Sequence, residues 1–260
     1  MTKALFFDVD GTLVSFNTHR IPQSAVDALA EAKRRGAMVF ISTGRPMRLI
    51  NNLDAIQHLV DGYITANGAC CSVGGETIAC REIPNPEARA LIGAAGRDGF
   101  SMLVVGESRL TVVNDGADVD RYFRRMLAVS DLGEGTALAD VLAERIVQLT
   151  PIIDEAAERR LMPLLPSCVS ARWFPAFTDI TARGADKGTA LMTVAAHLGI
   201  DRKDTVAFGD GGNDKSILQA AGTGVAMGNA PDDVKAVADY VTASVDEDGI
   251  ARALEHLCVI

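Results

Sequence analysis

The sequence lacks an excess of positive charge. Its 260 residues include 25 Lys and Arg against 34 Asp and Glu, which gives a formal net charge of −9 at pH 7. Proteins that bind nucleic acids by neutralising phosphates have the opposite balance, so the composition argues against a nucleic-acid partner. A small anionic substrate is compatible with this charge, because a cation bound in a cleft reverses the local field.

Cysteine pairs and long apolar runs are also absent. The chain has five cysteines, an odd number, and no C-x-x-C pair. This pattern favours reduced thiols in the cytoplasm over a zinc site or a disulfide framework. No apolar run reaches membrane-spanning length, and no signal peptide precedes the first apolar run. We therefore expect a cytoplasmic protein without a membrane partner.

Short apolar runs alternate with helical patterns at both ends of the chain. Strand–helix–strand units of this length imply a parallel sheet with right-handed crossovers. The predicted strands of this kind are Leu5–Val9, Ala37–Ile41, Tyr63–Thr65, Thr205–Phe208, Gly224–Met227 and Tyr240–Val241. We therefore predict an α/β fold with a Rossmann-like parallel-sheet core, formed by residues 1–81 and 184–260.

The middle of the chain has a different pattern. Strands come in pairs, such as Met102–Val105 with Leu110–Val113 and Val169–Phe174 with Phe177–Thr181, and helices lie between the pairs. Paired strands with interspersed helices are typical of an α+β unit rather than a doubly wound one. We predict that residues 82–183 form an inserted second domain.

Two helices of the first third have recognisable ends. Ser24 is the predicted N-cap of a helix that runs to Arg35 and ends at Gly36. Pro46 suits the first turn of a helix, which we expect to continue to about His58.

The most informative segment is Asp8-Val9-Asp10-Gly11-Thr12, at the end of the first predicted strand. Open α/β sheets place their ligands at the carboxyl ends of their strands. Two carboxylates there repel each other and are costly to desolvate, and a hard cation such as Mg²⁺ resolves that cost. The alternative is a capped turn in which Asp10 and Thr12 bond only local backbone.

Three other polar groups follow a predicted strand or open a predicted helix, namely Thr43-Gly44, Lys187 and Gly209–Asp214. In one parallel sheet, all four groups meet at the same edge. Their chemistry fits phosphoryl transfer, in which a carboxylate is the nucleophile and a lysine supplies a point charge. A second acid two residues beyond the nucleophile can protonate the leaving oxygen and then activate water.

Each of these residues also has an ordinary structural interpretation. Thr43 can be a helix N-cap, Lys187 a solvated first-turn lysine, and Gly209–Asp214 a plain turn. Arg45 can clamp a phosphate or form a structural ion pair, and the sequence favours neither. The joint occurrence of four such groups in this order favours the functional interpretation.

On these motifs the chain resembles the haloacid dehalogenase superfamily, specifically the Cof-type phosphatases with a subclass IIB α/β cap. The segments that carry the resemblance are Asp8–Thr12, Ser42–Pro46, Ala185–Gly188, Gly209–Asp214, Val225–Ala230 and Asp246–Ile250. The resemblance implies a haloacid dehalogenase-like core with an inserted cap. It also implies a Mg²⁺-dependent phosphatase acting on small phosphorylated metabolites, mostly sugar phosphates, as a monomer or small homo-oligomer.

The resemblance further implies a role for each site residue. Asp8 is the nucleophile, which forms an aspartyl-phosphate, and Asp10 is the general acid and base. Metal ligands are Asp8, the Asp10 carbonyl, Asp210, and Asp214 through water. Thr43, Gly44 and Lys187 bind the phosphoryl group. Asn213 is expected to contact phosphate or hold Lys187, and Asp179 has no assigned role.

Three other functions compete with this interpretation. A phosphomannomutase-like phosphotransferase has a similar core but needs a bisphosphate primer. A phospho-accepting signalling domain uses an Asp, a Thr and a Lys around Mg²⁺, but it needs only about half this length. A dinucleotide-binding protein is disfavoured because no G-x-G-x-x-G follows the first strand.

Overall fold

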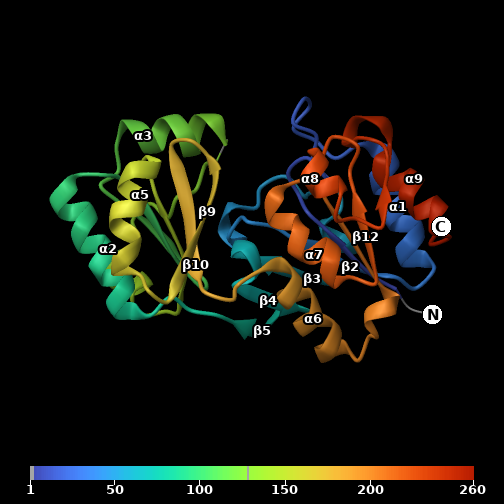
Figure 1. Cartoon of the computed structure of the whole chain (residues 1–260), viewed down its shortest axis with the longest axis horizontal. Coiled ribbons are helices and arrows are strands. Elements are labelled where there is room, and N and C mark those ends of the chain that lie inside the picture. The colour runs from blue at the N-terminus through green and yellow to red at the C-terminus, as the bar shows by residue number, and fades with distance from the viewer. Residues whose placement is uncertain (1–2, 128) are drawn as a thin grey trace. The chain divides into compact units, whose positions relative to one another are not determined.

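A computed structural model describes residues 3–127 and 129–260 of the chain. Its contacts divide the chain into two compact units (Figure 1). The first contains the chain up to Gly44, together with Asn52–Ala79 and Asp186–Ile260, and the second contains Arg45–Asn51 and Cys80–Ala185. No helix in these described ranges is long and apolar enough to cross a membrane.

The first unit is built on an eight-stranded sheet. In spatial order its strands are β13 (Tyr240–Val241), β12 (Thr223–Ala226), β11 (Thr205–Gly209), β1 (Ala4–Phe7), β2 (Met38–Ser42), β3 (Gly62–Thr65), β4 (Cys70–Val73) and β5 (Glu76–Cys80). Neighbours from β13 to β3 pair in parallel, and β3 pairs antiparallel with β4. The predicted parallel-sheet core is confirmed.

Register brings the candidate site residues to one edge of this sheet. Phe7 of β1 is aligned with Ile41 of β2 on one side and with Phe208 of β11 on the other. The residues that follow these strands therefore leave the sheet side by side. Central strands buried on both faces need apolar residues at every position, which is why β1 reads as an uninterrupted apolar run.

Aromatic stacking holds β1 to its neighbours on both faces. The rings of Phe6 and Phe40 stack with centroids 4.9 Å apart, and those of Phe7 and Phe208 stack at 4.6 Å. Phe6 and Phe40 belong to a core that also includes side chains of α6 (Lys187–Leu198) and α7 (Lys215–Ala220). Helices α1 (Gln23–Arg34) and α9 (Gly249–His256) pack against each other, and α1 contacts β2.

Short helical segments complete the first unit. They are η2 (Gln57–Leu59), η3 (Ala66–Gly68), η6 (Arg202–Asp204), η7 (Gly212–Asp214), η8 (Val245–Glu247) and α8 (Asp232–Lys235).

The predicted N-cap of α1 is wrong. The helix begins at Gln23, directly after Pro22, and the cap position has no side-chain hydrogen bond. Ser24 lies inside the first turn, and its hydroxyl donates to Asp248 Oδ1 at 2.6 Å instead. An N-cap hydroxyl would accept a hydrogen bond from a backbone N–H of the first turn, whereas the Ser24 hydroxyl donates a charge-assisted hydrogen bond to a carboxylate far away in sequence.

The predicted helix from Pro46 to about His58 is also wrong. The structure has two short 3₁₀ turns, η1 (Met47–Leu49) and η2, and Ile50 leaves the first turn in an extended conformation. The buried Leu49, Leu53 and Ile56 have helical spacing, which explains the prediction. Two consecutive asparagines, at positions 51 and 52, interrupt it, because asparagine is a weak helix former that bonds its own backbone.

The second unit is built on a five-stranded antiparallel sheet, as expected for an inserted α+β segment. Its strands in spatial order are β7 (Leu110–Val113), β6 (Met102–Gly106), β8 (Ile146–Pro151), β10 (Phe177–Ala182) and β9 (Cys168–Phe174). Its helical segments are η1, α2 (Asn85–Asp98), α3 (Ala117–Val119), the π-helical turn η4 (Asp120–Met126), α4 (Leu138–Val141), α5 (Glu155–Leu161) and η5 (Met162–Leu164).

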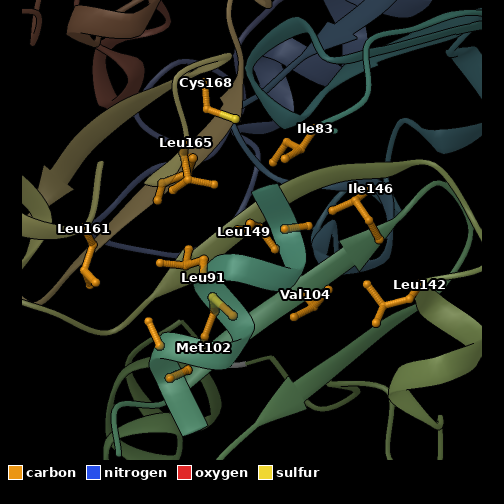
Figure 2. Close-up of a cluster of buried hydrophobic side chains, with 14 of the residues drawn as sticks. Ile83, Leu91, Met102, Val104, Leu142, Ile146, Leu149, Leu161, Leu165 and Cys168 are labelled. Carbon is orange, nitrogen blue, oxygen red and sulfur yellow. The ribbon is translucent and has the colours of Figure 1, made fainter. Parts of the chain in front are cut away.

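One face of this second sheet is covered by α2 and α5 (Figure 1). Figure 2 shows Leu91 of α2 over the strands, among Met102 and Val104 of β6 and Leu149 of β8. The alternate residues of β8 and β10 point to the other face, because successive strand side chains alternate. That face is polar around Asp179, whose Oδ1 accepts from the Gln148 amide and the Thr150 hydroxyl, both at 2.8 Å.

Candidate active site

Asp8 lies directly beyond β1, where its backbone N–H donates to the Phe208 carbonyl at 3.0 Å. The residue is buried, and the sheet hydrogen bond continues the strand up to it. Asp10, two residues on, is half-buried and forms an isolated bridge with Val14 in a tight turn. The two carboxylates therefore occupy different environments at the end of one strand.

Gly11 allows Asp210 to approach this turn. Its φ is +85°, and an added Cβ would lie 2.2 Å from Asp210 Oδ2. Thr12, the next residue, donates its hydroxyl to Asp210 Oδ1 at 3.1 Å. The alternative in which Thr12 bonds only local backbone is therefore wrong, since its partner is 198 residues away in sequence.

Three carboxylates form a cluster at this edge of the sheet. Oxygen atoms of Asp8, Asp210 and Asp214 all lie within 4.8 Å of one another. Asp210 directly follows β11, and Asp214 ends the 3₁₀ turn η7. The sequence predicts that these carboxylates meet, because they follow two strands of one parallel sheet.

Lys187 is the cationic partner of this cluster. It is the first residue of α6, after the N-cap Asp186, and its side chain is completely buried. Its Nζ lies 2.6 Å from Asp8 Oδ1 and 2.6 Å from Asp214 Oδ1. The interpretation of Lys187 as a solvated first-turn lysine is therefore wrong.

Asp214 is held by four hydrogen bonds. Its Oδ1 accepts from Lys187, and its Oδ2 accepts from the backbone N–H groups of Asp210 at 3.1 Å and Gly211 at 2.9 Å. Its own N–H donates to the Gly211 carbonyl at 3.0 Å. A side chain so fully bonded fixes the turn after β11 and orients Lys187.

Electrostatics make this cluster a fit for a divalent cation. Burial, with repulsion from Asp214 second, raises the pKa of Asp8 well above its usual value and that of Asp210 to about 7. Burial alone lowers the pKa of the Lys187 ammonium, but attraction to Asp214 and Asp8 outweighs it and raises that pKa. One ammonium faces three carboxylates, and carboxylate oxygens are donors that Mg²⁺ prefers. The donor set fits Mg²⁺.

Thr43 and Gly44 follow β2 at the same edge. Thr43 is buried, and its N–H donates to the Ile64 carbonyl at 2.9 Å. No helix begins directly after Thr43, since the next helical segment of the described chain is η1, which begins at Met47, so Thr43 is not a helix N-cap. An added Cβ on Gly44 would lie 2.9 Å from Asn67 Oδ1, which explains the small residue there.

Asn213 and Arg45 have specific partners. Asn213 Nδ2 donates to Asn67 Oδ1 at 3.0 Å, whereas Lys187 is held by carboxylates. The Arg45 guanidinium, in the second unit, donates to the Leu49 carbonyl and to Asn51 Oδ1, both at 3.2 Å. These contacts give Arg45 a role in its own loop.

Two asparagines at this edge had no role assigned from the sequence. Asn67 lies just beyond β3, and that strand-end position is the signal that could have identified it. Asn229 donates its amide to the Gly11 carbonyl at 2.9 Å and to Asp210 Oδ2 at 3.2 Å, and it accepts from Val245 N–H at 3.0 Å. Asn229 lies in the segment Val225–Ala230, which carries the family resemblance, but its position in the sequence does not indicate which residues it contacts.

The arrangement has clear relatives. Residues 5–254 match the model of the haloacid dehalogenase-like hydrolases. Phosphatase YwpJ of Bacillus subtilis (strain 168) is 30% identical, over 98% of this chain and 99% of its own. The 5-amino-6-(5-phospho-D-ribitylamino)uracil phosphatase YcsE of the same organism is 27% identical, over 98% of this chain and 95% of its own. The solved structure of the subclass IIB sugar phosphatase BT4131 matches with a TM-score of 0.90 and 45% identity, over 100% of both chains.

Proposed function

The chain belongs to the haloacid dehalogenase-like hydrolases and is a phosphatase of subclass IIB, and from that premise we propose that it hydrolyses small sugar phosphates through an aspartyl-phosphate at Asp8. The observation that carries the mechanism is the buried cluster in which Lys187 lies 2.6 Å from Asp8, beside Asp210 and Asp214. The sugar-phosphate class is supported by the 45% identity to BT4131, against 27% to YcsE.

In the first step, an Asp8 carboxylate oxygen attacks phosphorus and the ester P–O bond breaks. Asp10 gives its proton to the leaving oxygen, which departs as the alcohol. In the second step, Asp10 takes a proton from water, whose oxygen attacks the phosphorus of the aspartyl-phosphate. Inorganic phosphate leaves, and the Asp8 carboxylate and the Asp10 acid are restored.

The other residues bind and orient the phosphoryl group. The Lys187 ammonium neutralises its charge, while the Thr43 hydroxyl, the Gly44 N–H and the Asn213 amide donate to its oxygens. Asp8, Asp210, the Asp10 carbonyl and Asp214 would hold Mg²⁺, which when bound offsets negative charge at the phosphoryl oxygens. Asp8, Thr43 and Asp210 directly follow strands β1, β2 and β11, so the sheet sets the spacing of these groups before substrate binds.

The direct test is the Asp8→Asn variant, assayed with p-nitrophenyl phosphate and Mg²⁺. We expect loss of activity to the background rate, because an amide is a poor nucleophile toward phosphorus, and EDTA should abolish wild-type activity. Asp233→Asn is the matched control, since Asp233 is an exposed carboxylate bonded to Lys215. Full turnover by Asp8→Asn, or turnover only with a hexose bisphosphate primer, would contradict the proposal.

The substrate class is tested by a panel of sugar phosphates, nucleotides and phosphorylated cofactors compared by kcat/KM, because discrimination lies in that ratio. We expect the largest values among the sugar phosphates. A nucleotide or a ribitylamino-uracil phosphate with the largest kcat/KM would change the substrate class and leave the phosphatase mechanism intact.

A further inference from the structure

Three consecutive residues beyond β3 have left-handed backbone conformations. The φ angle is 50° at Ala66, 52° at Asn67 and 94° at Gly68, and all three residues are buried. Residues with a Cβ rarely adopt positive φ, and such conformations persist where the surrounding structure holds them, often at functional sites. Asparagine tolerates this region better than most residues. The surrounding structure therefore holds this turn in an unfavourable conformation, which is expected where the turn positions a functional side chain.

What the turn places is the side chain of Asn67. Its backbone N–H donates to the Thr43 carbonyl at 3.2 Å, which ties the turn to the loop after β2. Its Oδ1 accepts from Asn213 Nδ2 at 3.0 Å, which ties it to the turn after β11. The same oxygen lies close to Gly44, because a Cβ added to that residue would be 2.9 Å from it. One side chain thus contacts both loops at this edge of the sheet.

We propose that Asn67 is a positioning residue for the phosphoryl group, which it places by fixing the Asn213 amide and the backbone of Thr43-Gly44. This inference rests on the proposed function. A primary amide has two N–H donors, and Asn67 takes one of those on Asn213. The accepted hydrogen bond sets the plane of the Asn213 amide, so its second N–H has a fixed direction before a phosphoryl oxygen arrives.

The identity of the residue follows from two requirements. The position needs a short side chain with a neutral acceptor oxygen, and it needs a residue that tolerates positive φ. Glycine meets only the second requirement and alanine meets neither. Aspartate keeps the acceptor and the shape, but it adds a negative charge beside the group that binds a phosphate dianion.

The test uses Asn67→Gly and Asn67→Ala in the full chain, with kcat and KM for p-nitrophenyl phosphate, Ki for inorganic phosphate, and Tm. For Asn67→Gly we expect kcat/KM to fall about 10- to 100-fold and Ki to rise, because misplacement of about 1 Å costs up to about a hundredfold in rate. Asn67→Ala should lose similar activity and also have a lower Tm, because alanine is strained at φ 52°.

Asn114→Gly is the matched control. Asn114 has the same left-handed conformation, with φ 55°, and its amide donates to the Ala95 and Phe100 carbonyls in the second unit. We expect its Tm to fall while kcat/KM stays within about twofold of wild type, because only a structural contact is lost. A comparable fall of kcat/KM in both asparagine variants would reduce Asn67 to a structural role and overturn the inference.

A double-mutant cycle with Asn213→Ala separates positioning from an independent contribution. Asn67→Gly keeps the backbone N–H that donates to the Thr43 carbonyl and loses the side chain that bonds Asn213. Its effect should therefore act through Asn213, and the double variant Asn67→Gly/Asn213→Ala should be no more than about threefold less active than Asn213→Ala alone. Effects that multiply would contradict the proposal, as would an Asn67→Gly variant with wild-type kcat/KM. An inactive wild-type protein would instead refute the proposed function itself.

Asn67→Asp tests the same proposal should Asn67→Gly fail to fold. It keeps the acceptor oxygen and the size of the side chain, so we expect a Tm close to that of wild type. The added charge should raise Ki for inorganic phosphate at least about tenfold, because a like charge lies beside the anion. An unchanged Ki would show that Asn67 is remote from the phosphoryl group and would overturn the inference.

Discussion

Single residues at this site acquire their roles from partners far away in sequence. Thr12, Thr43 and Lys187 each have an ordinary local interpretation, and the structure contradicts all three of them. Lys187 is the clearest case, because a first-turn lysine is usually solvated, yet its ammonium lies between two buried carboxylates. Spacing along the chain cannot reveal such a partner, but the position of each residue after a strand can, because parallel strands gather those positions at one edge.

Thr12 is predicted to tune metal binding through Asp210. Thr12→Val removes the hydroxyl that donates to Asp210 Oδ1 and keeps the shape of the side chain. Because groups that orient a ligand commonly contribute about 10- to 100-fold in metal affinity, we expect a weaker Kd for Mg²⁺ by about tenfold. Isothermal titration with Mg²⁺ measures this change without turnover. Thr12→Ser is the control and should bind Mg²⁺ almost as wild type does; equal weakening in both variants would refute the role of the hydroxyl.

Whole elements were predictable where burial dictates composition. The apolar runs of β1, β2 and β11 and the helical pattern of α6 located these elements within a residue or two, because a buried strand or helix face admits few alternatives. The helix expected from Pro46 to about His58 failed because three buried side chains have helical spacing although the backbone is extended at Ile50 and forms only a turn at residues 54–56. The left-handed turn at Asn67 depends on contacts with Thr43 and Asn213, which no local pattern encodes.

Strands β8 and β10 of the second unit are predicted to depend on Asp179. Its carboxylate accepts from buried Gln148 and Thr150, so Asp179→Ala leaves both donors without this acceptor. The free energy of unfolding should fall by about 1–3 kcal/mol, measured by urea unfolding. Asp179→Asn keeps one acceptor oxygen and should lose less. A change below about 0.5 kcal/mol in Asp179→Ala would show that the cluster is not stabilising.

At the scale of the whole molecule, the first unit draws its sheet from both ends of the chain. β1 lies between β2 and β11, so neither end can form the central part of the sheet alone. The acid cluster and Lys187 all belong to this unit. Alternation of strand and helix at both ends predicted the parallel sheet of this unit, whereas the assignment of Arg45–Asn51 to the second unit depends on tertiary contacts that the sequence pattern does not carry.

Replacement of residues 82–183 by a short Gly-Ser linker is therefore predicted to leave a folded first unit. An added Cβ on Gly184 would lie 3.6 Å from the Arg81 guanidinium, so the residues flanking the replaced segment are close enough for a short linker. We expect one cooperative thermal transition by circular dichroism and an increase in Tm on addition of Mg²⁺. A broad transition, or no response to Mg²⁺, would show that the first unit needs the second to form its site.

The position of β1 between β2 and β11 also sets the order in which the site can arise during translation. Lys187 is 179 residues beyond Asp8 and β11 begins later still. At a synthesis rate of about 5–20 residues per second, Asp8 is synthesised roughly 10 to 35 s before its ammonium partner. Nascent and prematurely terminated chains thus carry the nucleophile without its counterion, and only a chain that extends beyond Asp214 holds the whole acid cluster.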